Sequence, residues 1–237
     1  MSNFTHFKNF TQLTQRAGNY LISRTPDNPE EFAWENLRGK TVIGGRLGGM
    51  PQMILEYILT ENGLISGVDV EIITNLQFAS TAGAFIAGIG DYTMEFDPSA
   101  LAIEQTGQGF VVRGLGTDSG IVPYTVYMAN KSFIAENPDI IQRFTNAIYR
   151  GQQWFFENSS RAVAELIHPH FEEHSIDDLE IMIERYREMD VFSHNPILSQ
   201  DGFERLQDIM DLSGELSQRV EFTTLIDNYF AETAVRN

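Results

Sequence analysis

Between residues 41 and 116, short apolar runs alternate with segments whose apolar residues recur at helical spacing. Short apolar runs bounded by glycine or polar residues are typical of buried strands, and apolar residues three and four positions apart are typical of amphipathic helices. The pattern predicts strands at 41–43, 70–74, 92–96 and 110–113, and helices at 51–62, 80–89 and 98–105. This alternation indicates a parallel sheet covered by helices, and therefore an α/β fold.

The pattern is different on both sides of this region. Strands are predicted at 19–23 and 124–129, and most of the chain after residue 130 is predicted to be helical, with helices from 137 onward and at 175–189, 199–212 and 223–234. Ser175 and Asp178 form a capping-box-like pair at the start of the second of these helices. The buried stripe of the first is expected to contain Ile140, Ile141, Phe144, Ile148 and Phe155.

A loop with four glycines joins the first strand of the alternating region to its first helix. Gly44, Gly45, Gly48 and Gly49 precede a helix start marked by Pro51, whose fixed φ suits the first helical turn. Glycines let backbone N–H groups approach a ligand, and a helix N-terminus favours negative charge. Together with the Arg46 guanidinium, these features predict a binding site for an anion or polar group, whose candidate residues are Arg46, Gly48, Gly49 and Met50. The alternative interpretation is a turn that only closes a βα unit.

Dinucleotide binding would need an acidic residue at the end of the second strand, to hold the ribose hydroxyls. That strand ends instead in Asn75, and Asp69 lies at its beginning, at the opposite edge of the sheet. The pattern therefore disfavours a nucleotide site.

Polar residues follow the next two strands as well, and the carboxyl ends of parallel strands share one edge of the sheet. Gln77, Ser80 and Thr81 follow the second strand, and Glu95 and Phe96 end the third. We expect these residues to contribute to the same site, with Phe96 stacking on a ligand ring. The alternatives are that Ser80 caps a helix and that Phe96 belongs to the core.

The composition limits the possible partners and chemistry. Lys and Arg number 16 against 33 Asp and Glu, and the net charge of −17 disfavours nucleic acid and anionic lipid as partners. The chain has no cysteine, and no serine lies near a histidine and an acid in a catalytic arrangement. His168, His170 and His174 could surround a metal, but a loop between two helices explains them more simply. We therefore expect no enzyme activity, no metal and no cofactor.

The N-terminal residues contain no apolar segment of the kind found in signal peptides, and the chain contains no apolar run long enough to span a membrane. Taken literally, this predicts a cytoplasmic protein. However, the strand at 19–23 has almost nothing before it to pair with, which suggests that an upstream segment is missing.

Four segments resemble one known family, the NMT1/THI5-like and SsuA-like substrate-binding proteins of nitrate, sulfonate and taurine type ABC transporters. These segments are QLTQRAGNYLISR, WENLRGKTVIGGRLGGMPQMILEYIL, DVEIITNLQFASTAGAFIAGIGDYTMEFDPSA and YTVYMANKSFIAENPDIIQRFTNAIYRGQQW. The resemblance implies a type II periplasmic-binding-protein fold, whose two lobes close on a small ligand without chemistry. It further implies ABC permease subunits as partners, an extracytoplasmic location, and a ligand contact from Gln12.

On this resemblance, residues 37–116 form the second lobe, and residues 1–36 and 117–237 form the first. The usual opening βα units of the first lobe are absent from the chain, so the first lobe is expected to be incomplete. An incomplete sheet would expose strand edges near residues 20–23 and 124–129, and exposed edges favour self-association. Two alternatives remain open: a biosynthetic enzyme for the thiamine pyrimidine, which shares this fold, and a truncated remnant that binds nothing.

Overall fold

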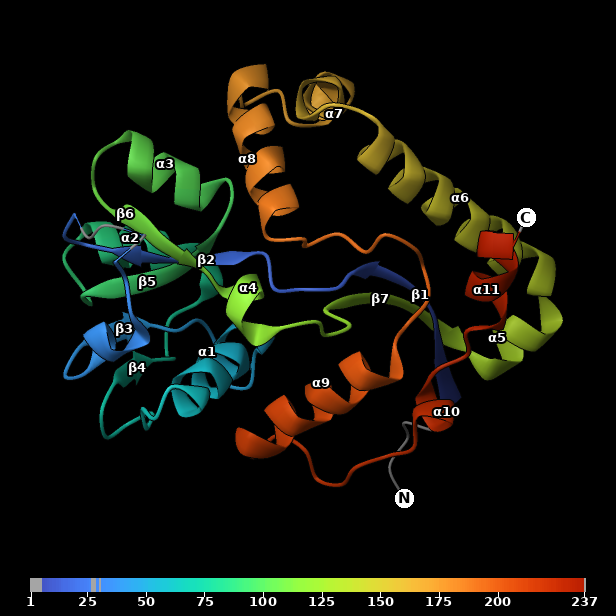
Figure 1. Cartoon of the computed structure of the whole chain (residues 1–237), viewed down its shortest axis with the longest axis horizontal. Helices are drawn as coiled ribbons and strands as arrows, with labels where there is room; N and C mark the ends of the chain where they lie inside the picture. Colours follow the sequence, from blue (N-terminus) through green and yellow to red (C-terminus); the bar gives the residue numbers. More distant parts are fainter. Residues whose placement is uncertain (1–5, 27–28, 30, 237) are drawn as a thin grey trace. The chain divides into compact units, whose positions relative to one another are not determined.

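The computed structural model describes residues 6–26, 29 and 31–236, and the chain divides into two compact units (Figure 1). Unit 2 consists of Ala17–Gly120 and Ile209–Glu215. Unit 1 consists of the described residues up to Arg16, Ile121–Asp208, and those from Leu216 onward. These boundaries differ from the lobes expected from the sequence, because residues 17–36 belong to unit 2.

Unit 2 is built on a five-stranded sheet. In spatial order its strands are β4 (Glu71–Ile73), β3 (Thr41–Ile43), β5 (Tyr92–Phe96), β2 (Asn19–Ser23) and β6 (Phe110–Gly114). β3 is parallel to β4 and β5, and β2 is antiparallel to both β5 and β6. The four strands other than β2 therefore run in one direction, and their carboxyl ends lie at one edge of the sheet.

β2 is the main departure from the expected sheet. All five of its residues are buried, and it lies between β5 and β6. The expectation of an exposed edge near residues 20–23 is therefore wrong. A strand that is covered on both faces and paired on both sides suits an unbroken buried run such as Tyr20, Leu21 and Ile22.

The helices of unit 2 are η2 (Trp34–Leu37), α1 (Met50–Glu61), η3 (Phe78–Ser80), α2 (Thr81–Ile86), α3 (Ser99–Gln105) and α4 (Leu115–Ser119). The sequence predicted α1, α2 and α3, but not η2, η3 or α4. α2 and α3 contact each other and β5, whereas α1 contacts α4. α1 starts one residue earlier than predicted, with Gly49 as its N-cap and Pro51 in its first turn.

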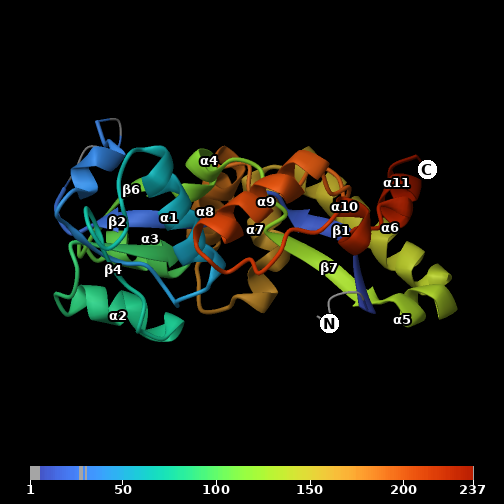
Figure 2. The same cartoon turned by 90° about the horizontal axis from the view of Figure 1, so that it is seen from below.

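Unit 1 contains a two-stranded antiparallel sheet and most of the helices. Its elements are β1 (Phe7–Thr14), β7 (Thr125–Asn130), α5 (Lys131–Glu136), α6 (Pro138–Glu157), α7 (Ser160–Ile167), η4 (His168–His170), α8 (Ile176–Glu188), α10 (Phe222–Leu225) and α11 (Tyr229–Arg236). α9 (Gln200–Leu212) begins in unit 1, and its last turn belongs to unit 2. β1 and β7 run side by side in both views (Figures 1 and 2).

The sequence did not predict β1, although this strand supplies the pairing partner of β7 and carries Phe10 of the unit 1 core. The predicted helix at 223–234 is in fact two helices, separated by residues 226–228. The predicted stripe of α6 is only partly right, because Ile141 is buried but Ile140 and Phe144 are 46% and 38% exposed.

The predicted cap of α8 is confirmed, since the Ser175 side chain accepts a hydrogen bond from the Asp178 amide. Within the described residues, no helix is both long enough and apolar enough to cross a bilayer.

Candidate functional site

The loop between β3 and α1 lies at the carboxyl edge of the unit 2 sheet, where the strand order reverses. The chain passes from β3 to β4 on one side, and the following strand, β5, lies on the other side of β3. Open α/β sheets commonly bind ligands at such a switch point, because neighbouring loops diverge there. The topology thus supports the predicted position of the site.

Two glycines of this loop are required by the packing of the chain itself. A β-carbon on Gly44 would lie 2.2 Å from Ile72 Cγ2, and one on Gly49 would lie 2.9 Å from the carbonyl oxygen of Arg46. Neither clash involves a ligand. A bulky substitution at Gly49 would therefore disturb the loop whether or not the loop binds anything.

The backbone amides of the loop are only partly available to a ligand. The N–H groups of Leu47, Gly48 and Gly49 donate to Thr74 O, Gln52 Oε1 and Arg46 O at 3.3, 2.9 and 2.9 Å. Those of Gly45, Arg46 and Met50 have no acceptor among the described residues. The exposed Arg46 guanidinium forms no ion pair within the same part of the chain. Among the described residues, one cationic side chain and three amides without an acceptor therefore remain in the loop before α1 and at its first residue.

An acidic residue that sequence reasoning missed lies against this loop. The Glu215 carboxylate is so close to Gly48 that a β-carbon there would lie 3.1 Å from Glu215 Oε1. Gly48 has a φ of 71°, which favours glycine. Glu215 is 167 residues away from Gly48 in the sequence, and no local pattern indicates that they meet. The loop therefore carries a carboxylate as well as a guanidinium.

The three candidates that follow β4 have different environments. Gln77 and Ser80 are exposed, whereas Thr81 is fully buried and its hydroxyl donates to Phe78 O at 2.8 Å. Ser80 occupies the N-cap position of α2 but forms no side-chain capping bond, so the alternative interpretation of Ser80 as a cap is wrong. Gln77 and Ser80 are the two with side chains open to a solute.

Glu95 and Phe96, at the end of β5, lie on opposite faces of the sheet because side chains alternate along a strand. Glu95 is 2% exposed, and its Oε1 accepts a hydrogen bond of 2.9 Å from the Thr93 hydroxyl. Burial raises the pKa of Glu95 above its ordinary value, and the hydrogen bond from Thr93 opposes that rise. Phe96 is half-buried and makes an edge contact with Phe78, with ring centroids 5.9 Å apart. Glu95 is therefore an interior group, whereas Phe96 is partly accessible.

Gln12 is in unit 1, unlike the other nine candidates. It is buried in β1, and its Nε2 donates to Thr14 O at 3.3 Å. A further residue that the sequence did not single out is Asn19, at the start of β2 opposite Phe96. Its side chain is fully buried, and its Oδ1 has no hydrogen-bond partner in the part of the chain that the structure describes. The sequence signal that could have identified Asn19 as a candidate is its position as a polar residue at the start of an apolar strand.

The three histidines lie in or just after η4, the short helix between α7 and α8. Within the described residues, no group of three or more His, Cys, Asp or Glu side chains is arranged to hold a metal ion.

Comparison with known proteins gives the family. Residues 5–162 match the family described as NMT1/THI5 like. The chain belongs to this family. It is also 40% identical over 224 residues to a Bacillus subtilis (strain 168) protein named "Putative binding protein YtlA". That alignment covers 94% of this chain and 66% of YtlA, so the chain spans slightly less than two thirds of this relative.

Solved structures show the same fold at low sequence identity. The alkanesulfonate-binding protein SsuA from Xanthomonas axonopodis pv. citri, bound to MOPS, is 14% identical with a TM-score of 0.69; the match covers 94% of this chain and 74% of that one. The desulfurization enzyme DSZB is also 14% identical, with a TM-score of 0.60 and coverage of 98% and 80%. The fold is therefore that of the two-lobe periplasmic binding proteins, as the resemblance implied. The desulfurization enzyme DSZB shares this fold.

Proposed function

We propose that the protein is the solute-binding component of an ABC importer, and that it works outside the cytoplasmic membrane with permease subunits. Its solute is a small anion or a nitrogen heterocycle. The family and the relative named as a binding protein support this class of function. The observation that carries the site is the Arg46 guanidinium, which has no ion-pair partner among the described residues, beside amides without an acceptor at the start of α1, at the switch point of the sheet.

The charges around the loop narrow the solute further. Arg46 and the N-terminus of α1 attract a negative group, whereas the Glu215 carboxylate beside Gly48 repels one and accepts hydrogen bonds. A solute that carries both an acceptor group and an N–H donor could bind Arg46 through the acceptor and Glu215 through the donor. Gln77 and Phe96 are proposed to supply a further hydrogen bond and a stacking surface.

Calorimetric titration with MOPS, taurine, nitrate and aminopyrimidines would test this proposal. Arg46→Ala should weaken binding by about tenfold to a hundredfold, the usual effect of losing a charge-assisted hydrogen bond. The melting temperature without solute should stay unchanged, because Arg46 is exposed and forms no ion pair with any described residue. Lys40→Ala is the matched control, since Lys40 precedes the opposite end of β3 and is also exposed.

Equal affinity of the Arg46→Ala variant and the parent would remove Arg46 from the site. If none of the four classes of solute binds, the proposed solute class is wrong. Conversion of a substrate to a pyrimidine product, followed by mass spectrometry, would instead favour the alternative biosynthetic enzyme.

A further inference from the structure

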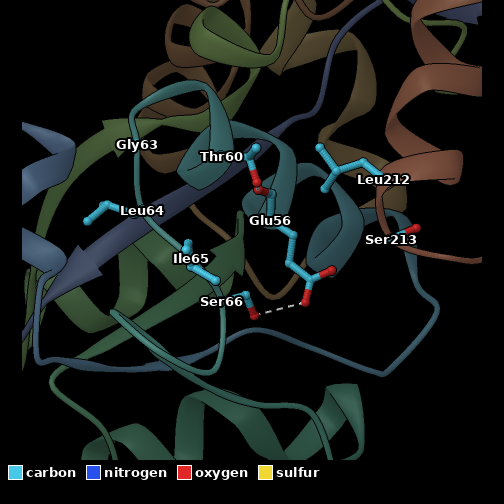
Figure 3. A pocket seen from close by; sticks show the side chains of 8 residues that line it. All are labelled: Glu56, Thr60, Gly63, Leu64, Ile65, Ser66, Leu212 and Ser213. Carbon is cyan, nitrogen blue, oxygen red and sulfur yellow. Dashed lines mark hydrogen bonds between the residues drawn. The ribbon is translucent and has the colours of Figure 1, made fainter.

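Unit 2 contains a cavity at the other end of α1, away from the glycine-rich loop (Figure 3). Its volume is about 660 Å³, and its lining residues are Glu56, Thr60, Gly63, Leu64, Ile65, Ser66, Leu212 and Ser213. None of these residues was a candidate for the solute site. Because a helix rises about 1.5 Å per residue, the C-terminal end of α1 lies roughly 16 Å from its start. The lining residues Glu56 and Thr60 lie roughly 9 and 15 Å along the axis from that start, so the cavity has a different lining from the proposed solute site.

The polar groups of this cavity are mainly hydrogen-bond acceptors. Glu56 is the only ionisable side chain among the eight lining residues, and its Oε1 accepts a bond of 3.1 Å from Ser66 Oγ (Figure 3). The hydroxyls of Thr60 and Ser213 already donate to the carbonyl oxygens of Glu56 and Met210, at 2.9 and 3.0 Å. The side chains thus offer lone pairs and a negative charge, while their hydroxyl protons are engaged within the chain.

Two helix ends add to this negative potential. α1 ends at Glu61 and α9 ends at Leu212, and neither helix has a basic residue in its last turn. The C-terminus of a helix carries a partial negative charge of about half an electron, which favours cations nearby. The net charge of −17 acts in the same direction.

The remaining walls of the cavity are aliphatic. Leu64 is buried, whereas Ile65 and Leu212 are 59% and 43% exposed next to the carboxylate. An alkyl chain that covers exposed aliphatic side chains removes apolar surface from water, which favours binding. The cavity therefore suits a group with a cationic head and a short aliphatic stem.

We propose that this cavity binds an ammonium or guanidinium group on a short aliphatic chain, with Glu56 as its charge partner and Ile65 and Leu212 against the chain. Free alkylamines offer such a group, as do the lysine and arginine side chains of another protein. The probes are n-butylammonium and agmatine for the free source, and a capped lysine or arginine tripeptide for the protein source.

Calorimetric titration of the whole chain should show binding of at least one probe and no binding of 1-butanol, which has the same aliphatic chain without the charge. Glu56→Gln keeps the shape of the side chain and an acceptor for Ser66 but removes the charge, and should weaken binding at least about tenfold. Glu61→Gln is the control, because Glu61 is exposed on the same helix but does not line the cavity. Binding should also weaken as salt is added.

A second variant protects the test against a folding defect. Ile65→Lys places an ammonium group at the cavity from an exposed position, and it should abolish binding of the probes while thermal unfolding stays cooperative. Binding of the tripeptides alone would identify a protein side chain as the source. The proposal is wrong if no probe binds, if 1-butanol binds equally well, or if Glu56→Gln binds as tightly as the parent.

Discussion

Strand β2 of unit 2 and strand β1 of unit 1 are stabilised by different kinds of contact. β2 in unit 2 carries Leu21 and Ile22, both fully buried, between two partner strands. β1 in unit 1 buries Phe10 but also the polar residues Thr11 and Gln12, and its side chains and backbone bond to residues of α6. Removing volume from an apolar core destabilises a protein because it leaves a cavity. Removing one partner of a buried polar pair destabilises it because the other group is left without a hydrogen bond. The two units should therefore respond to different substitutions.

The largest expected effect is on the apolar strand. Ile22→Ala should lower the free energy of unfolding by about 3–5 kcal/mol, because it leaves a cavity beside a fully buried strand. Met128→Ala in β7 is the contrasting change, since Met128 is 62% exposed and should cost less than about 0.5 kcal/mol. Urea unfolding of both variants would measure the difference. Similar losses at the two positions would contradict the comparison.

A second substitution tests how tightly the unit 2 core is packed. A β-carbon on Gly109 would lie 2.7 to 2.9 Å from side-chain atoms of Ile103, Ile22 and Phe85. Gly109→Ala should therefore cost about 2 kcal/mol through overpacking. Gly83→Ala meets no atom within 4 Å inside α2 and should instead stabilise by about 0.5–1 kcal/mol. A neutral Gly109→Ala would show that this part of the core can adjust.

The same contrast explains which strands could be predicted from the sequence. Thr41, Val42 and Ile43 form a short β-branched run before a glycine, and that local signal was enough to predict β3. β1 has no clear period, because its burial depends on β7 and α6, more than 100 residues away. Local patterns therefore miss elements whose burial is decided by distant partners.

The candidate site shows the same limit. Arg46 and Gln77 were predicted from strand-to-loop junctions, and the structure places both in exposed loops of unit 2. The contact of Glu215 with Gly48 could not be predicted, since only folding brings these residues together. Glu95 is interior because both faces of β5 are covered, so that Met94 and Glu95 are both buried, and a strand pattern alone does not give this.

The polar contacts of unit 1 can be tested by removing one partner at a time. Thr11 and Thr145 are both fully buried, with their hydroxyl oxygens 2.8 Å apart. Thr145→Val should cost about 1–2 kcal/mol, because it leaves the Thr11 hydroxyl buried without its partner. The double variant Thr11→Val with Thr145→Val should recover most of that loss. Additive losses in the double-mutant cycle would show that the two hydroxyls are not coupled.

The smallest expected effect concerns Glu95, whose carboxyl group is buried in unit 2. Its pKa in the folded protein is raised above the ordinary 4.5 by burial, so the folded state holds the proton more tightly than the unfolded state. Its contribution to stability is therefore complete below the ordinary pKa and is lost as the pH rises through the raised value. Compared with Glu95→Gln, which carries no charge at any pH, the parent protein should lose stability as the pH rises from the ordinary pKa of 4.5 through the raised value. Urea unfolding of both proteins across this range measures the difference. If the difference in free energy of unfolding between the two proteins stays constant with pH, ionisation of Glu95 does not destabilise the folded state. Its carboxylate would then be in contact with water or with a compensating hydrogen-bond donor.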